Sequence, residues 1–176
     1  MSELDEAWAL ALAEAQRKAQ GAGRADIAAY LRLRSSNDLL RKTGVAWLLH
    51  TFAQLAGKAN RGGASLQTAT DDAHRFSVNH ATMVGPRLTL NFGVRSLSVE
   101  AGWPRVPSDS FVRGGGLALG RIKHFGKNLL NQELMLVRSA SGLPEWVVIT
   151  KGGRKEPLHE SDVQSHLNKL LSPDYR

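Results

Sequence analysis

The stretch that decides the fold runs from Gly85 to Phe125 and reads GPRLTLNFGVRSLSVEAGWPRVPSDSFVRGGGLALGRIKHF. From Leu88 to Val94, apolar residues occupy every second position, which is typical of a strand with one buried face. From Leu97 onward the apolar residues move to the other set of alternate positions. Because a slip of one residue turns every side chain to the wrong face, the pattern predicts a bulge or a tight hairpin within Gly93 to Ser96.

Further strands are predicted on both sides of this stretch. Two segments downstream are apolar at consecutive positions, which indicates strands covered on both faces, and Ser141-Gly142 predicts a hairpin turn between them. Weaker strand patterns precede the central stretch, and its last part again reads as a strand. The predicted strands, beyond the one at Leu88, are Leu66–Thr70, Arg75–Met83, Leu117–Phe125, Gln132–Arg138 and Glu145–Thr150.

Helical patterns lie at the two ends of the chain. Three helices are predicted before the strands, over Ser2–Gln20, over Ala25–Leu33, and from Ser35 or Ser36 to about Lys58. A last helix begins at His159 or Ser161. Helices, then strands, then one helix indicate an α+β fold, in which about three N-terminal helices and a C-terminal helix pack on a mainly antiparallel sheet of five or six strands.

The length of 176 residues predicts one domain, with a helical part over 1–62, a sheet part over 63–158 and a closing helix over 159–176. The sequence has no cysteine and no apolar run long enough to span a bilayer. An acidic N-terminus without a signal-peptide pattern favours a cytoplasmic protein of bacterial type with no membrane partner.

The basic residues point to a polyanionic partner. The net charge is +7, the isoelectric point is near 10.1, and the excess is spread along the chain rather than carried on a tail. Arginine side chains on the polar face of a sheet suit a phosphate backbone, since each offers a planar fork of donors. The alternative is a solvated face, whose charges bind no partner and only keep the sheet soluble. The candidate nucleic-acid contacts are Arg87, Arg95, Arg105, Arg113, Arg121 and Lys123.

Two other binding modes compete with the basic face. Trp103 stands in a proline-stiffened loop, where its ring either folds back over the sheet or anchors a protein partner. The apolar and polar residues of the second and third predicted helices follow an order similar to that of a helix-turn-helix unit, in which a recognition helix would begin near Ser36. The turn between them lacks the usual glycine.

An enzyme ranks third among the hypotheses, after a nucleic-acid-binding protein and a protein-interaction subunit that docks through the Trp103 loop and a sheet edge. Asp71, Asp72 and His74, or Asp109 and His124, could serve a small metal-dependent hydrolase or nuclease. No HExxH motif or nucleophile elbow accompanies them, so we expect no catalytic residues, no bound metal and no cofactor. The sequence therefore favours a non-enzymatic protein that binds nucleic acid through a basic sheet face and loop.

Overall fold

The structure is a computed structural model that describes residues 3–78, 80–105, 112 and 114–173. Contacts divide the chain into two compact units, residues 1–42 and 43–176. The α+β fold is confirmed: helices come first, an antiparallel sheet follows and a helix ends the chain. The single-domain organisation stays a prediction. None of the helices within the described residues is long and apolar enough to cross a membrane.

The N-terminal helices in the described part number two, not three. Helix α1 covers Glu3–Gly21, and α2 covers Ala25–Arg61 without a break. The predicted boundary at Ser35-Ser36 was wrong because the stretch holds no proline, and two serines inside a long helix cost little. With no turn at this point, the helix-turn-helix hypothesis fails. In the first unit, the Arg34 guanidinium lies 5.0 Å from the centre of the Trp8 ring.

Within the described residues, the strands form one seven-stranded antiparallel sheet in sequence order, rather than five or six strands. Arg75–Met83 was predicted as one strand, but it contains the connection between two strands that pair with each other. A final short strand was missed because it has only three exposed residues. The strands are β1 (Gln67–Val78), β2 (Ala81–Phe92), β3 (Arg95–Gly102), β4 (Ala118–His124), β5 (Gln132–Arg138), β6 (Pro144–Ile149) and β7 (Lys155–Pro157).

The predicted change of phase after Val94 is a tight hairpin. Phe92 pairs with Arg95, so Gly93 and Val94 form the whole loop between β2 and β3. Gly93 has a φ of 58°, the left-handed region that glycine enters without strain. The turn reverses the chain, and the apolar residues of both strands therefore lie on the same face of the sheet.

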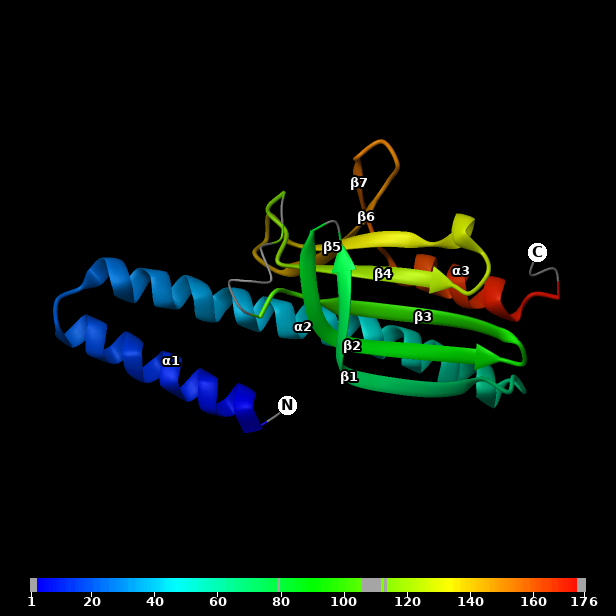
Figure 1. The fold of residues 1–176 in the computed structure, drawn as a ribbon, viewed down its shortest axis with the longest axis horizontal. Helices are drawn as coiled ribbons and strands as arrows, with labels where there is room; N and C mark the ends of the chain where they lie inside the picture. Colours follow the sequence, from blue (N-terminus) through cyan, green and yellow to red (C-terminus); the bar gives the residue numbers. More distant parts are fainter. Residues whose placement is uncertain (1–2, 79, 106–111, 113, 174–176) are drawn as a thin grey trace. The chain divides into compact units, whose positions relative to one another are not determined.

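That apolar face is covered by helices, which are the 43–61 part of α2 and α3 (Glu160–Leu171) (Figure 1). The Trp146 indole N–H donates to the Gly44 carbonyl oxygen over 2.7 Å, which ties β6 to α2. A Cβ on Gly44 would lie 2.5 Å from Leu136 Cδ1, so the helix approaches β5 closely here and a larger residue would require the Leu136 side chain to shift. The largest buried side chains on the helices and strands of this unit include Leu48, Phe52, Leu90, Leu97, Ile122, Leu134, Leu136, Leu167 and Leu170.

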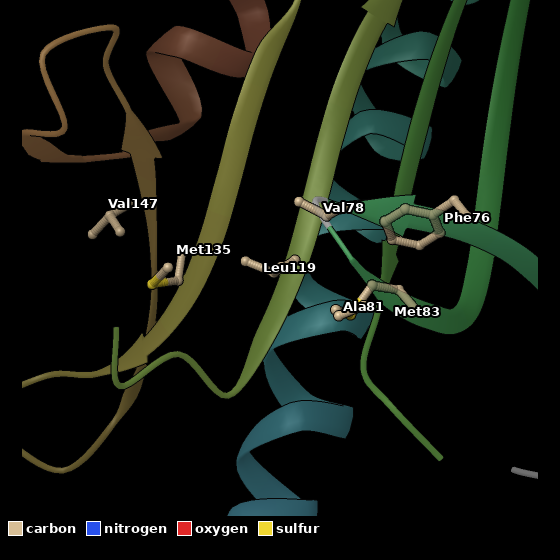
Figure 2. Close-up of a cluster of buried hydrophobic side chains, with 7 residues drawn as sticks. All are labelled: Phe76, Val78, Ala81, Met83, Leu119, Met135 and Val147. Atoms are coloured by element: carbon tan, nitrogen blue, oxygen red, sulfur yellow. The ribbon is translucent and has the colours of Figure 1, made fainter. Parts of the chain in front are cut away.

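Among the described residues, the tip of the β1–β2 hairpin covers one end of the opposite face. Figure 2 shows hairpin side chains around Phe76 and Met83 beside a row of sheet residues. Gly85 allows the bend that brings the tip over: a Cβ at this position would lie 2.1 Å from the Ala101 carbonyl oxygen. The buried cluster comprises Phe76, Val78, Ala81, Met83, Leu119, Met135 and Val147. The other end of this face, called the uncovered face from here on, is the candidate site.

Candidate functional site

A row of charged side chains crosses the uncovered face, one from each of five neighbouring strands. Their backbone positions are direct partners in the register, and directly opposed residues project from the same face. The signs alternate along the row, which is Asp71, Arg87, Glu100, Arg121 and Glu133. This alternation could not be foreseen, because the five residues come from places in the sequence that only strand pairing brings together.

The row is held by ion pairs at its outer positions. Arg87 lies 3.4 Å from Asp71 Oδ2, and Arg121 lies 3.6 Å from Glu133 Oε1. Opposite charges facing each other across strands stabilise a sheet modestly and favour one register. Arg87 and Arg121 were both candidate contacts, and the sequence did not show whether they share a face; the register places both on this face with acidic neighbours.

Glu100, at the centre of the row, is buried, with only 2% of its surface exposed. Its Oε2 lies 3.0 Å from His74 Nε2, and its Oε1 lies 2.6 Å from Lys123 Nζ. Oε1 makes no hydrogen bond of good geometry within the described residues, although the Lys123 charge is close. A buried carboxylate needs such compensation. Glu100 therefore fixes where the Lys123 ammonium group lies.

An extra residue in β1 places His74 on this face. Asp71 pairs with Arg87 and His74 pairs with Gly85, so the register shifts by one between them. As a result His74 Nδ1 lies 3.7 Å from Asp71 Oδ2, whereas in a regular strand His74 would share a face with Asp72, two residues before it. Among the described residues, no group of three His, Asp or Glu side chains is arranged to hold a metal ion.

Beyond the row, Lys123 and Phe125 line a polar hollow at the end of β4. The backbone N–H of Phe125 donates to the Ser96 carbonyl oxygen, which continues the β3–β4 pairing by one residue beyond His124. Lys123 and Phe125 therefore project from the same face, and the Phe125 ring is 78% exposed. The hollow has a volume of about 350 Å³ and is lined by Ser96, Ser98, Lys123, His124, Phe125, Gly126, Asn128 and Asn131.

Another predicted contact, Arg95, lies elsewhere. Arg95 was predicted to share a polar face with Arg87, and this was wrong because the Gly93-Val94 hairpin leaves it on the helix-covered side. Its guanidinium donates to the Leu170, Ser172 and Pro173 carbonyl oxygens at the end of α3, where a cation is favourable. Arg113 lies outside the described residues.

Trp103 folds back over the sheet and is 7% exposed. It pairs with Val84 through two backbone hydrogen bonds, so the loop residue continues the β2–β3 ladder. The Arg105 guanidinium lies 3.9 Å from the centre of the Trp103 ring and covers it. Of the two placements that the sequence allowed, the structure has the one that leaves little of the ring for a partner.

His124, considered above as a catalytic residue, belongs to the covered face. His166 Nε2 lies 3.0 Å from Gln132 Oε1, and His166 Nδ1 lies 2.9 Å from His124 Nε2. Burial, together with nearby Lys169, lowers the pKa of His124 to about 4. Burial first, then His124 and Lys169, lower the pKa of His166 to about 4, against a smaller opposing effect of Asp162. Both rings are therefore neutral at pH 7 and serve packing.

Sequence reasoning missed Phe125 and the asparagine-containing turn beside it. A signal was present, because Arg121, Lys123 and Phe125 stand at alternate positions in the sequence. The hollow itself was missed because the turn after Phe125 has no periodic pattern: its 3₁₀ helix at Asn128–Leu130 is held by a side-chain contact, the donation from the His124 N–H to Asn131 Oδ1 over 2.8 Å. No protein-family model, curated protein or solved structure matches this chain.

Proposed function

We propose that the protein binds nucleic acid on the uncovered face of its sheet. The observation that carries this proposal is the gathering of Arg87, Arg121 and Lys123 on one solvent-open face beside an exposed aromatic ring. Cationic side chains that track a phosphate backbone next to aromatic rings are the usual surface of a protein that binds nucleic acid without a sequence code. Arg95 and Arg105, which were expected to contribute, have structural partners instead.

The acidic residues of the row limit how much of the affinity is electrostatic. Asp71, Glu100 and Glu133 accompany the three cations, so the face has little excess charge. Each phosphate neutralised contributes about −0.7 to the slope of log K against log salt for a single strand. Three contacts predict a slope of about −2, or a loss of roughly 20-fold in affinity between 50 and 200 mM salt.

Docking of a protein partner has less support. Trp103 is buried, and of the two edge strands in the described sheet, β1 and the three-residue β7, the longer strand β1 has the register shift after Asp71 and two adjacent aspartates. A bulge and charged side chains are devices by which edge strands avoid pairing with other chains. The uncovered face, rather than the edge, is therefore the proposed binding surface.

The test is fluorescence anisotropy of a labelled 20-nucleotide DNA and RNA, titrated with the full chain at 20, 50, 100 and 200 mM salt. We expect micromolar or tighter binding at low salt with the slope given above. The triple variant Arg87→Gln, Arg121→Gln and Lys123→Gln should bind at least tenfold more weakly at 50 mM salt, and its salt slope should approach zero. Absence of binding by the unaltered protein at 20 mM salt contradicts the proposal.

A matched variant separates the face from net charge. Lys18, Lys58 and Lys151 lie elsewhere on the chain, and their replacement by Gln removes the same charge. An equal loss of affinity in this control would show that the bound surface is not the one proposed. Because Lys123→Gln leaves the buried Glu100 less compensated, thermal unfolding accompanies each variant, and Arg87→Gln alone provides a second measurement in a folded protein.

A further inference from the structure

The hollow beside Phe125 differs from the charged row in the chemistry that it offers. It lies on the same face as Lys123, at the end of β4, and its lining includes Asn128, the first residue of the 3₁₀ helix at Asn128–Leu130. Its lining includes Ser96 and Ser98, which carry hydroxyl groups, and two residues with carboxamides, Asn128 and Asn131, of which Asn131 Nδ2 donates to Asn128 Oδ1 over 3.5 Å. These groups both donate and accept hydrogen bonds, whereas phosphate only accepts. The hollow thus suits a ligand with mixed donors and acceptors.

Phe125 supplies a flat apolar surface at the same place. Phe125 is 78% exposed, at the end of the face where the charged row and the polar hollow lie. Ser96 is its partner across the β3–β4 pairing, which fixes the backbone beneath the ring. The backbone N–H of His124 donates to Asn131 Oδ1 over 2.8 Å, which holds the asparagine turn against the end of β4. An exposed ring on such a fixed support loses little freedom when something stacks on it.

We infer that the ligand is single-stranded nucleic acid, in which one unstacked base lies on the Phe125 ring with its edge toward the hollow. This inference rests on the proposed function. A nucleobase has an apolar face and an edge of mixed donors and acceptors, and the hollow of about 350 Å³ is in the size range of small-ligand sites. Lys123, two residues before Phe125 on the same face, lies where the phosphate next to that base would pass.

A duplex fits this surface poorly. Bases in a duplex are stacked on each other, and their edges are reached by an element that protrudes into a groove. Phe125 follows β4, the fourth of the seven strands in the described sheet, so neighbouring strands flank it on both sides. Contacts of a duplex with this face would reach only phosphates, and the ring would contribute nothing.

The test compares four labelled probes: oligo(dT) and oligo(U) of 12 nucleotides, and DNA and RNA duplexes of 12 base pairs. We expect the single strands to bind at least tenfold more tightly than the duplex of the same sugar at 100 mM salt. The two single-stranded arms decide between DNA and RNA. Phe125→Ala should weaken the binding of single strands by roughly 5- to 150-fold, because stacking of one base on an aromatic ring contributes about 1–3 kcal/mol to binding. The affinity for duplexes should stay within twofold.

Two variants keep the result interpretable. Leu129→Ala removes another exposed apolar side chain from the adjoining turn, outside the lining of the hollow, and should leave binding unchanged. Phe125→Tyr keeps a stacking ring and should retain the affinity of the unaltered protein. Equal affinity for single strands and duplexes, with no effect of Phe125→Ala, overturns this inference and leaves the proposed function standing. Failure of all four probes to bind overturns the proposed function itself.

Discussion

On the face covered by α2 and α3, even the polar groups face inward. The Trp146 indole N–H donates to a carbonyl oxygen of α2, and the neutral His124 and His166 are hydrogen-bonded to each other. On the uncovered face, cations alternate with acids, and an aromatic ring faces solvent. Both faces are built from the same strands. Buried groups, which predominate on the first face, contribute to stability, whereas the exposed groups of the second face can contact a ligand.

The largest expected effect on the free energy of unfolding comes from a comparison in which one phenylalanine on each side of the sheet is replaced by alanine. Phe52 of α2 is fully buried, so Phe52→Ala should lower the free energy of unfolding by about 3–5 kcal/mol. Phe125→Ala should change it by less than about 0.5 kcal/mol, because the ring is already in water. Urea unfolding followed by circular dichroism measures both. Comparable losses in the two variants would show that Phe125 is part of the packed core.

Acid should destabilise the fold through the two buried histidines of the covered face. The pKa of both His124 and His166 is lowered to about 4, whereas an unfolded histidine titrates near 6.5. Between these values the unfolded chain binds more protons than the folded chain, so stability falls as the pH decreases from about 6.5 to about 4. Urea unfolding at pH 7.0 and pH 4.5 measures the change.

Two histidine variants isolate the contribution of the pair. His166→Gln should unfold more easily at pH 7 and lose less stability between pH 7.0 and pH 4.5 than the unaltered protein. His50→Gln, at an exposed position of α2, should keep the original dependence. A dependence in His166→Gln as steep as that of the unaltered protein would assign the acid sensitivity to carboxylates instead.

The smallest effect is expected in the charged row. Asp71 and Arg87 are both partly exposed, and such pairs contribute about 0.2–1 kcal/mol. A double-mutant cycle with Asp71→Asn and Arg87→Gln should give a coupling within that range, decreasing with added salt. A coupling above about 2 kcal/mol would mean that the row organises the sheet, rather than lying on a face that the covered core already fixes.

Local sequence patterns predicted helices and strands correctly where burial alone determines the pattern. The alternation from Leu88, the slip at Gly93-Val94 and the doubly covered strands β5 and β6 are confirmed, because burial on one or both faces leaves a periodic trace in the sequence. Errors occurred where that trace is absent. The serines at 35–36 resemble a helix boundary but lie inside α2, and the exposed residues of β7 carry no apolar pattern.

The candidate site could be predicted in part only. Arg121 and Lys123 stand two residues apart, so a regular strand puts them on one face, but whether that face also holds Arg87 depended on a strand register that the sequence did not show. The alternating acids could not be foreseen, since strand register pairs Glu100 with residues that lie 13 positions before it and 21 positions after it. The inserted residue in β1 also replaced Asp72 by Asp71 as the neighbour of His74.

The sequence by itself determined the class of fold, the order of its elements and which strand face is apolar, because these depend on periodicity within single segments. Tertiary structure alone decided that the cations of the open face lie among acids, that Arg95 binds the end of α3, and that Phe125 rather than Trp103 is exposed. The physical reason is distance along the chain: charge pairing and exposure are fixed by neighbours that only the packed sheet brings together.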